Sequence, residues 1–344
     1  MAAKGESMDE VENQVYDRQI RLWGLEAQQR MRSSRVLICG MGCLNAELCK
    51  NLVLAGVNVC LQDHLPVEAN DNAGNIFVSA EDNGKNRAEA CVVRAKELNG
   101  LVNVDCETKP LEDLDDSFFT AFTVVCVSGA SRKNMLRLDT ICREAGTFFY
   151  AGTAFGYDGV LFCDLGPRHH FEREGGPKTA PAAPAPAGGG GGSSSGAQAA
   201  PGEVASYPSL QDALGTKWSV LTHRRRGKVY MAPKPFVLLQ VLEELEEQMG
   251  RPVKGMQEGD LNELVQISTR LLQDNEMPPD FLTEDDLRIL CSVANTEISP
   301  VCAIVGGIWG QEVLKAISRK GEPVNNFFVF SGISSEGKVI RLPK

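Results

Sequence analysis

Several features that define particular classes of protein are missing from this sequence of 344 residues. The first twenty positions carry charged residues throughout and contain no apolar core of a signal peptide. The longest apolar stretches, such as residues 301–309, are far too short to span a bilayer. We therefore predict an intracellular protein without a membrane partner.

Basic residues are in the minority, and paired cysteines are absent. The chain has 35 Lys and Arg against 45 Asp and Glu, with a formal net charge of -10. Such a surface repels phosphate backbones, so the composition argues against nucleic acid as a partner. No Cys-x-x-Cys pair occurs among the 11 cysteines, which leaves a zinc site with little support. Scattered thiols in odd number predict reduced, mostly buried cysteines.

Large apolar residues are almost absent from one internal segment. Between Glu174 and Ser206 the chain consists mainly of Pro, Ala, Gly and Ser. Such a segment cannot compensate the entropy lost on ordering, because it has little apolar surface to bury. We predict a flexible insertion over residues 172–206, between an N-terminal half, residues 1–171, and a C-terminal half, residues 207–344.

The rest of the N-terminal half alternates between strand and helix patterns. Strands are predicted at residues 35–39, 57–61, 123–127 and 147–150, and helices at 46–54, 86–98 and 135–145. This alternation implies a parallel sheet with helices on both faces. After the insertion, helices are predicted at 236–248, 261–272, 283–294 and 300–317, and a hairpin at 327–330 and 338–340.

A glycine turn follows the first predicted strand. Gly40 and Gly42 fit the first two glycines of G-x-G-x-x-G, and Asp63 stands near the position of a ribose-binding acid. Asn45 replaces the third glycine, where a side chain obstructs close packing of helix and strand. The pattern predicts a Rossmann-like strand–turn–helix unit. From these residues alone, a nucleotide site and a degenerate pocket on the same fold are both open.

Longer motifs resemble one family. Residues 16–24 (Tyr-Asp-Arg-Gln-Ile-Arg-Leu-Trp-Gly) and the strand that ends at Gly40 resemble the opening of ubiquitin-like-protein activating enzymes. Residues 50–57, 84–90 and 298–316 continue the match, which covers nearly the whole chain except the insertion. The resemblance implies an α/β fold, a Rossmann-like adenylation domain of the ubiquitin-activating/ThiF type, with a parallel sheet and flanking helices.

The family adenylates the C-terminal carboxylate of a modifier protein with ATP. The resemblance places Gly74 where active members carry an arginine, Arg87 where they carry a lysine, and Ala130 where an aspartate holds magnesium. Without these groups, nothing stabilises the charge that builds on the transferred phosphate. We therefore expect this chain alone to bind no cofactor and no metal and to adenylate nothing. ATP and Mg²⁺ are expected in a partner subunit.

One functional group is expected to remain. Arg18 belongs to the Tyr-Asp-Arg-Gln segment, which in dimers of this family resembles an arginine finger that reaches the partner's ATP phosphates. Arginine suits this role because it stays charged and can bridge two phosphate oxygens. The alternative is that Arg18 pairs with Asp17 or Glu12 on an exposed helix. No cysteine lies between Cys163 and Cys291, and no nucleophile for a thioester is identified.

The ending at residues 325–328 (Asn-Asn-Phe-Phe) resembles the smaller, non-catalytic subunit of the SUMO type. The resemblance implies a regulatory subunit that pairs with a larger catalytic subunit, serves a SUMO-type modifier, and is nuclear and cytoplasmic. Three alternatives remain open. They are the smaller subunit of the neddylation-type enzyme, a homodimeric adenylyltransferase of the ThiF/MoeB type, and a nicotinamide-dependent oxidoreductase that rests only on Gly40, Gly42 and Asp63.

Overall fold

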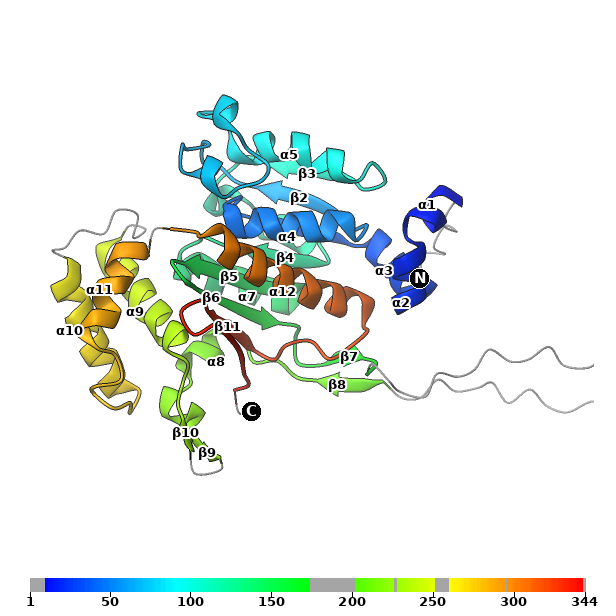
Figure 1. Cartoon of the computed structure of the whole chain (residues 1–344). Coiled ribbons are helices and arrows are strands. Elements are labelled where there is room, and N and C mark those ends of the chain that lie inside the picture. Colours follow the sequence, from blue (N-terminus) through cyan, green and yellow to red (C-terminus); the bar gives the residue numbers. More distant parts are fainter. Residues whose placement is uncertain (1–9, 174–201, 226–227, 251–259, 295, 343–344) are drawn as a thin grey trace, which may run out of the picture.

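The computed structural model describes residues 10–173, 202–225, 228–250, 260–294 and 296–342. Its centre is an eight-stranded sheet with the strand order β12-β11-β6-β5-β4-β1-β2-β3 (Figure 1). The strands of this sheet are β1 (Arg35–Cys39), β2 (Asn58–Gln62), β3 (Val104–Glu107), β4 (Val124–Val127), β5 (Phe148–Phe155), β6 (Asp158–Asp164), β11 (Phe327–Ser331) and β12 (Glu336–Ile340).

The sheet is parallel in one half and antiparallel in the other. β3, β2, β1, β4 and β5 pair in parallel, in the order 3-2-1-4-5 of a doubly wound sheet. β6 turns back against β5, and β11 and β12 extend the sheet in antiparallel register. The predicted α/β class with its parallel strands and the predicted C-terminal hairpin are confirmed. The antiparallel strand β6 was not predicted.

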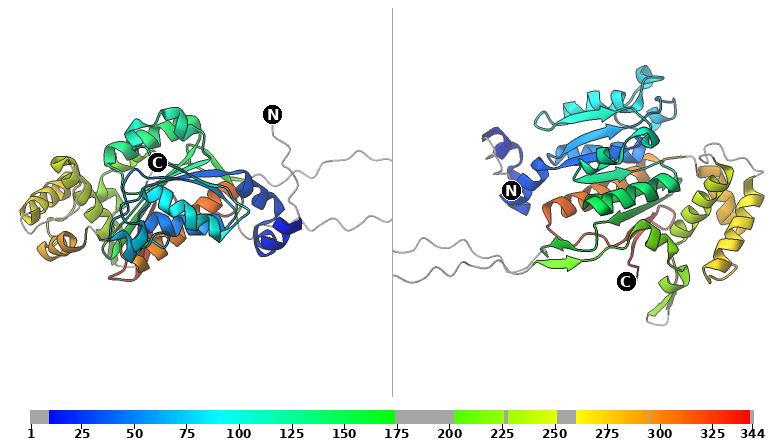
Figure 2. Two further views of the ribbon diagram at one scale, coloured as in Figure 1. Left: turned by 90° about the horizontal axis from the view of Figure 1, so that it is seen from above. Right: turned by 180° about the vertical axis from the view of Figure 1, so that it is seen from behind.

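Helices cover both faces of the sheet (Figure 2). One face packs against α3 (Leu25–Ser33), α4 (Cys43–Leu54), α5 (Arg87–Leu98) and α12 (Ser299–Ser318). The other packs against α6 (Asp116–Thr120), α7 (Arg132–Ala145), α8 (Leu210–Gly215) and α9 (Lys234–Met249). Two further helices, α10 (Asp260–Asp274) and α11 (Glu284–Val293), lie next to α9 at the end of the sheet opposite to α1 (Glu10–Val15) and α2 (Asp17–Trp23).

Two cores result from the alternation of side chains along the central strands. Val36 and Ile38 of β1 belong to the core under α4 and α12, whereas Leu37 and Cys39 belong to the core under α7 and α9. Successive side chains of a strand point to opposite faces, so a strand covered on both faces must be apolar throughout. This explains the uninterrupted apolar run that predicts β1.

Helix α12 connects the two ends of the molecule. In the described part of the chain it is the one helix with the length and apolar composition of a membrane span, but about 67% of that window is buried. It packs along α4, β5 and β6, with Gly306 so close to α4 that a β-carbon there would lie 2.8 Å from the Cβ of Glu47. Pro300 lies in the first turn of the helix, where the backbone amide has no intrahelical acceptor. We conclude that α12 is a core helix.

The predicted insertion falls largely outside the described residues, at 174–201. On either side of this gap, β7 (His169–Phe171) and β8 (Glu203–Ala205) pair with each other in antiparallel register. A second short ribbon consists of β9 (His223–Arg225) and β10 (Lys228–Tyr230). The division into residues 1–171, 172–206 and 207–344 stays a prediction.

Candidate functional site

The glycine turn joins β1 to α4. Gly40 has a φ of +83°, and a β-carbon there would lie 2.2 Å from the carbonyl oxygen of Ser128 at the end of β4. Only glycine satisfies both the positive φ and this close approach. Gly42 is extended and directly precedes the first residue of α4, Cys43. The strand–turn–helix unit predicted from the sequence is therefore present.

Asn45 does not obstruct the packing of α4, contrary to the expectation from the third glycine position. Its side chain is fully buried, and the amide nitrogen donates to the carbonyl oxygens of Cys39 at 2.8 Å and of Gly40 at 2.7 Å. Asparagine is accommodated because its amide can donate to both of these carbonyl groups. The carbonyl of Cys39 also accepts from the backbone amide of Ser128 at 3.0 Å.

Asp63, the candidate ribose-binding acid, is bound within the chain. Its Oδ2 accepts from the amide of Met41 at 2.7 Å and lies 3.2 Å from Nη1 of Arg87. Arg87 also pairs through Nε with Asp71 at 3.1 Å. Burial alone would lower the pKa of Arg87, but the two carboxylates outweigh it and the pKa is raised. Arg87, which the resemblance aligns with a lysine of active members, is thus held by two carboxylates of its own chain.

The N-terminus of α4 has a carboxylate partner that the sequence did not predict. Oε2 of Glu297 accepts from the amide of Cys43 at 2.5 Å, and the amide of Leu44 also donates to this side chain. Burial raises the pKa of Glu297, while these two amides and then Arg87 act in the opposite direction. No local pattern could have indicated the contact, because Glu297 follows Cys43 by 254 positions.

Gly74 and Ala130, the two other positions that the resemblance aligns with functional residues of active members, lie beside this turn and after β4. A β-carbon at Gly74 would lie 2.9 Å from Sγ of Cys43, so the turn leaves no room for a longer side chain pointing that way. Ala130 follows β4 and is partly buried. Within the described ranges, no group of three or more His, Cys, Asp or Glu side chains is arranged to hold a metal ion.

The segment that carries Arg18 is anchored at the other end of α4. Tyr16 is buried and its hydroxyl accepts from the side-chain amide of Asn99 at 2.8 Å, while Gln19 donates to the carbonyl of Leu54 at 3.3 Å. A helix rises 1.5 Å per residue, so the twelve residues of α4 separate this anchor from the glycine turn by roughly 18 Å. Arg18 therefore does not reach the turn of its own chain.

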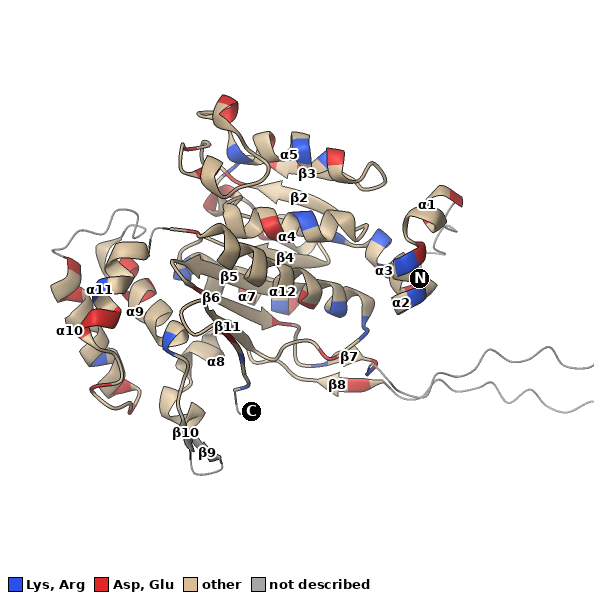
Figure 3. Cartoon of the chain, viewed as in Figure 1, with Lys and Arg blue, Asp and Glu red and all other residues tan. Residues whose placement is uncertain are grey.

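Neither carboxylate considered as a partner for Arg18 pairs with it. Asp17 pairs with Arg21 at 3.0 Å, and Glu12 pairs with Arg32 at 2.8 Å. Arg18 itself is exposed, and within the part of the chain that the structure describes it makes no ion pair or hydrogen bond. Figure 3 places α2 and α3, with their basic residues, at the edge of the molecule remote from the acidic helices α10 and α11.

The sequence pattern of the ThiF family matches residues 16–344. The chain belongs to the ThiF family. Similar proteins include SUMO-activating enzyme subunit 1 of Xenopus tropicalis, which is 38% identical over 98% of this chain and 98% of its own length. The same subunit of Homo sapiens is 38% identical over 97% and 96%, and that of Danio rerio 36% identical over 96% and 95%.

The ThiF match begins at Tyr16, the first residue of the motif from which the resemblance was drawn. It confirms the predicted family, and it extends through α12 and the C-terminal hairpin. This chain keeps the family's strand–turn–helix unit but binds its polar groups internally.

The cysteines of this ThiF protein are free thiols, as predicted. Nine of the eleven are buried, Cys291 is partly buried and Cys106 is exposed. Burial raises the pKa of Cys39, Cys126 and Cys163 well above the ordinary thiol value. A thiolate is the reactive form of cysteine, so these three buried thiols are unsuited to nucleophilic attack.

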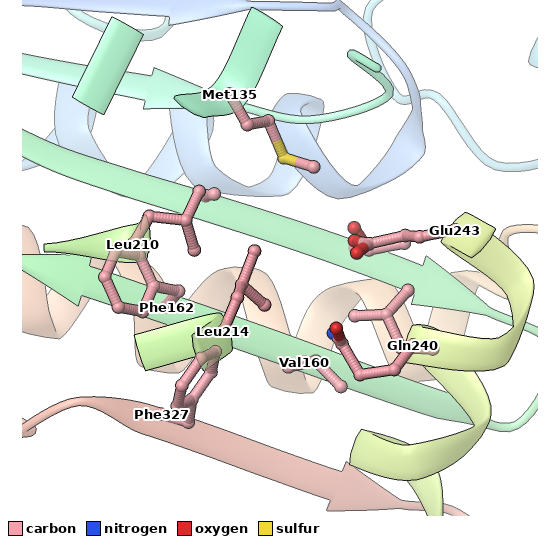
Figure 4. A pocket seen from close by; sticks show the side chains of 11 residues that line it. Met135, Val160, Phe162, Leu210, Leu214, Gln240, Glu243 and Phe327 are labelled. Carbon is pink, nitrogen blue, oxygen red and sulfur yellow. The ribbon is translucent and has the colours of Figure 1, made fainter. Parts of the chain in front are cut away.

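A small cavity lies between the sheet and helices α7, α8 and α9 (Figure 4). Its volume is about 30 Å³, which suffices for a water molecule or two but not for a nucleotide. At its edge, Glu243 pairs with Arg132 at 3.1 Å, and its neighbour Glu244 pairs with Arg270 at 2.6 Å. Both glutamates are half-buried, and they connect α9 to α7 and to α10.

Proposed function

We propose that this chain is the smaller, regulatory subunit of a heterodimeric SUMO-activating enzyme. In that complex a larger catalytic subunit holds ATP and Mg²⁺ and adenylates the modifier. The proposal is supported by relatives that are named as subunits of a SUMO-activating enzyme and match over nearly their whole length. The same relatives favour the SUMO type over the neddylation type, which the sequence alone left open.

The observation that carries the proposal is the internal pairing of the chain's own nucleotide features. Asp63 is held by the amide of Met41 and by Arg87, and the N-terminus of α4 is held by Glu297. The positions of the cationic and metal-binding groups carry Gly74 and Ala130 instead. Phosphoryl and adenylyl transfer depend on groups that neutralise developing charge, so the reaction must take place on the partner.

Arg18 is proposed to act on the partner's ATP. Its helix is fixed by Tyr16 and Gln19 at the end of α4 farthest from its own glycine turn. An exposed guanidinium that is anchored through its neighbours and lacks a described partner suits a contact with a second subunit's phosphates. An arginine supplied in trans raises phosphoryl-transfer rates by stabilising the charge of the transition state.

The exposed face of α12 supports assembly with a partner. Ile304 is 43% exposed, and its neighbours on this face are the small or apolar residues Ala303, Gly307 and Ile308. Leu22 of α2 is 80% exposed, and it lies one helical turn after Arg18 on the same helix. Exposed apolar surfaces of this kind are typical of protein–protein contacts. We assign both to the heterodimer.

The decisive experiment is ATP–pyrophosphate exchange by the reconstituted heterodimer. Arg18→Ala should lower the exchange rate on the order of 100-fold, which is typical of removing one transition-state contact. Arg18→Lys should recover only part of it, because lysine lacks the planar fork. Arg288→Ala, on an exposed pair with Glu284 of α11, is the matched control and should behave as wild type.

Size-exclusion chromatography distinguishes a variant that has lost the contact between Arg18 and ATP from one that no longer binds the larger subunit. The Arg18 variants should co-elute with the larger subunit, and the isolated chain should give no exchange. Full activity of the Arg18→Ala heterodimer would rule out the finger. Exchange by the isolated chain would instead favour the homodimeric adenylyltransferase.

We also propose a nuclear and cytoplasmic location, as expected for a subunit of a SUMO-activating enzyme. The proposal rests on the family resemblance alone. Cell fractionation that recovers the chain only with membranes would contradict it.

A further inference from the structure

The N-terminus of helix α4 is the place where the strand–turn–helix unit of a nucleotide-binding fold holds a phosphate. There, amides at the start of the helix and the positive end of the helix dipole face the anion. In this chain those amides already have an anionic partner. Glu297 accepts from Cys43 at 2.5 Å and from Leu44, the first two residues of α4.

The carboxylate leaves no space for a phosphate at the turn. A β-carbon on Gly42 would lie 2.6 Å from Oε2 of Glu297, so the carboxylate rests directly on the backbone that a phosphate would approach. A carboxylate resembles a phosphate in charge sign and in having several acceptor oxygens. It therefore satisfies the same donors without a ligand.

The position of Glu297 is fixed by the surrounding backbone. The amide of Gly156, after β5, donates to the carbonyl of Thr296 at 2.8 Å, and Gly156 and Glu297 form an isolated parallel bridge. Ile298 then caps α12 and Ser299 begins it. Glu297 is thus held between the end of β5 and the start of the family's long core helix.

We propose that Glu297 is an internal substitute for the nucleotide phosphate and closes this chain's own anion site. The ligand class it excludes is a phosphate, free or as part of a nucleoside phosphate. The inference concerns the chain's own turn, and it holds whether or not Arg18 acts on a partner.

The charges around the turn define what removal of Glu297 would create. Arg87 attracts an anion at this position, whereas Asp71 repels one. Asp63 is engaged with Arg87 and Met41, so the ribose of a nucleotide would find no free acid. We therefore expect a phosphate site of modest affinity, in which ADP gains little over inorganic phosphate.

The test uses the full-length chain with Glu297→Ala and with Glu284→Ala as the charge-matched control. Glu284 pairs with Arg288 on the exposed surface of α11. In chloride, Glu297→Ala should lower the unfolding temperature by several degrees, because two helix amides and the helix dipole lose their partner. At equal ionic strength, inorganic phosphate should raise it again by mass action, and ADP to a similar extent.

Isothermal calorimetry should show phosphate binding to Glu297→Ala at least tenfold tighter than to the wild type or to Glu284→Ala. A Glu297→Ala protein with no phosphate-dependent gain over Glu284→Ala would overturn the proposal. If Glu297→Ala does not fold, Glu297→Gln is tested in its place, because glutamine keeps an acceptor oxygen and removes the charge. Unfolding temperatures of Glu297→Gln identical to wild type in both chloride and phosphate would equally overturn it.

Discussion

The phenol ring of Tyr16 lies over the α-carbon of Gly56, where a β-carbon would be 2.8 Å from the ring carbon that bears the hydroxyl. Gly56 also has a φ of +87°, so both the backbone conformation and the close contact with Tyr16 favour glycine at this position. Because Tyr16 anchors the helix of Arg18, the contact links the end of α4 to the proposed finger. The two residues are separated in sequence by the whole of α2, α3, β1 and α4.

We predict that Gly56→Ala lowers the free energy of unfolding by roughly 2–5 kcal/mol, the sum of the left-handed backbone and the overpacking against Tyr16. Gly146→Ala is the control, because Gly146 has a φ of +75° but an added β-carbon meets nothing within 4 Å. It should cost only about 1–2 kcal/mol. Urea denaturation measures both, and equal losses would show that the Tyr16 contact contributes nothing.

A buried pair of carboxyl groups predicts a dependence of stability on pH. Burial, and then the charge of Asp164, raise the pKa of Asp139 to about 7. Oδ2 of Asp139 accepts from the amide of Leu210 at 2.7 Å, and its Oδ1 has no hydrogen-bond partner within the described residues. Arg143 pairs with Asp164 at 2.5 Å. Protonated Asp139 is therefore the form that suits the fold near neutral pH.

A folded-state pKa above the unfolded value contributes stability below pH 4 that is lost as the pH rises to about 7. Asp139→Asn keeps an oxygen acceptor for the amide of Leu210 but has nothing to ionise. Relative to wild type it should become more stable between pH 5 and 8, by at most ~4 kcal/mol, since each pKa unit corresponds to about 1.4 kcal/mol. Thermal melts across this range, with exposed Glu144→Gln of α7 as control, test the sign.

His169 predicts the opposite dependence at acid pH. It is buried in β7 with its ring 5.2 Å from that of Phe148, and its Nε2 has no hydrogen-bond partner within the described residues. Burial, and then repulsion by Arg319, lower its pKa to about 4. The neutral ring is thus favoured in the folded state, and stability falls as the pH drops from 6.5 toward 4.

We predict that His169→Phe removes this loss, which amounts to at most ~3 kcal/mol for the wild type. Phenylalanine fits the aromatic surroundings and leaves no unpaired nitrogen. His170→Gln, at the exposed adjacent position, is the matched control. Melting curves between pH 4.5 and 7 in which His169→Phe and His170→Gln decline in parallel would count against the assignment.

The parts of the fold that follow a local pattern could be predicted from the sequence. The apolar runs of β1 and β4 and the spacing of α4, α5 and α12 specify buried strands and core helices without long-range information. β3 (Val104–Glu107) was not predicted, because it has only four residues at the edge of the sheet and its polar residues Asp105 and Glu107 leave no continuous apolar run. β6 was also missed, although it pairs with β5 across the short turn at Gly156 and Tyr157 as well as with the distant β11.

The residues of the candidate site also fall into those that a local pattern predicts and those that it does not. Gly40, Gly42 and Asp63 are recognisable from spacing, because a turn and the strand that follows it are local features. The contacts that decide the state of the turn are not local. Asp63 meets Arg87 from the next helix, and Cys43 meets Glu297 from the far end of the chain. Such contacts depend on the packed sheet, which no short motif encodes.

The link between Cys43 and Glu297 also has a consequence for biosynthesis. The ribosome makes the glycine turn early, whereas the carboxylate that pairs with it is added more than 250 positions later. Until then, the first amides of α4 can bond only to water or to passing anions such as cellular phosphates. Completion of the glycine turn therefore depends on the C-terminal part of the chain, and long-range contacts of this kind slow folding.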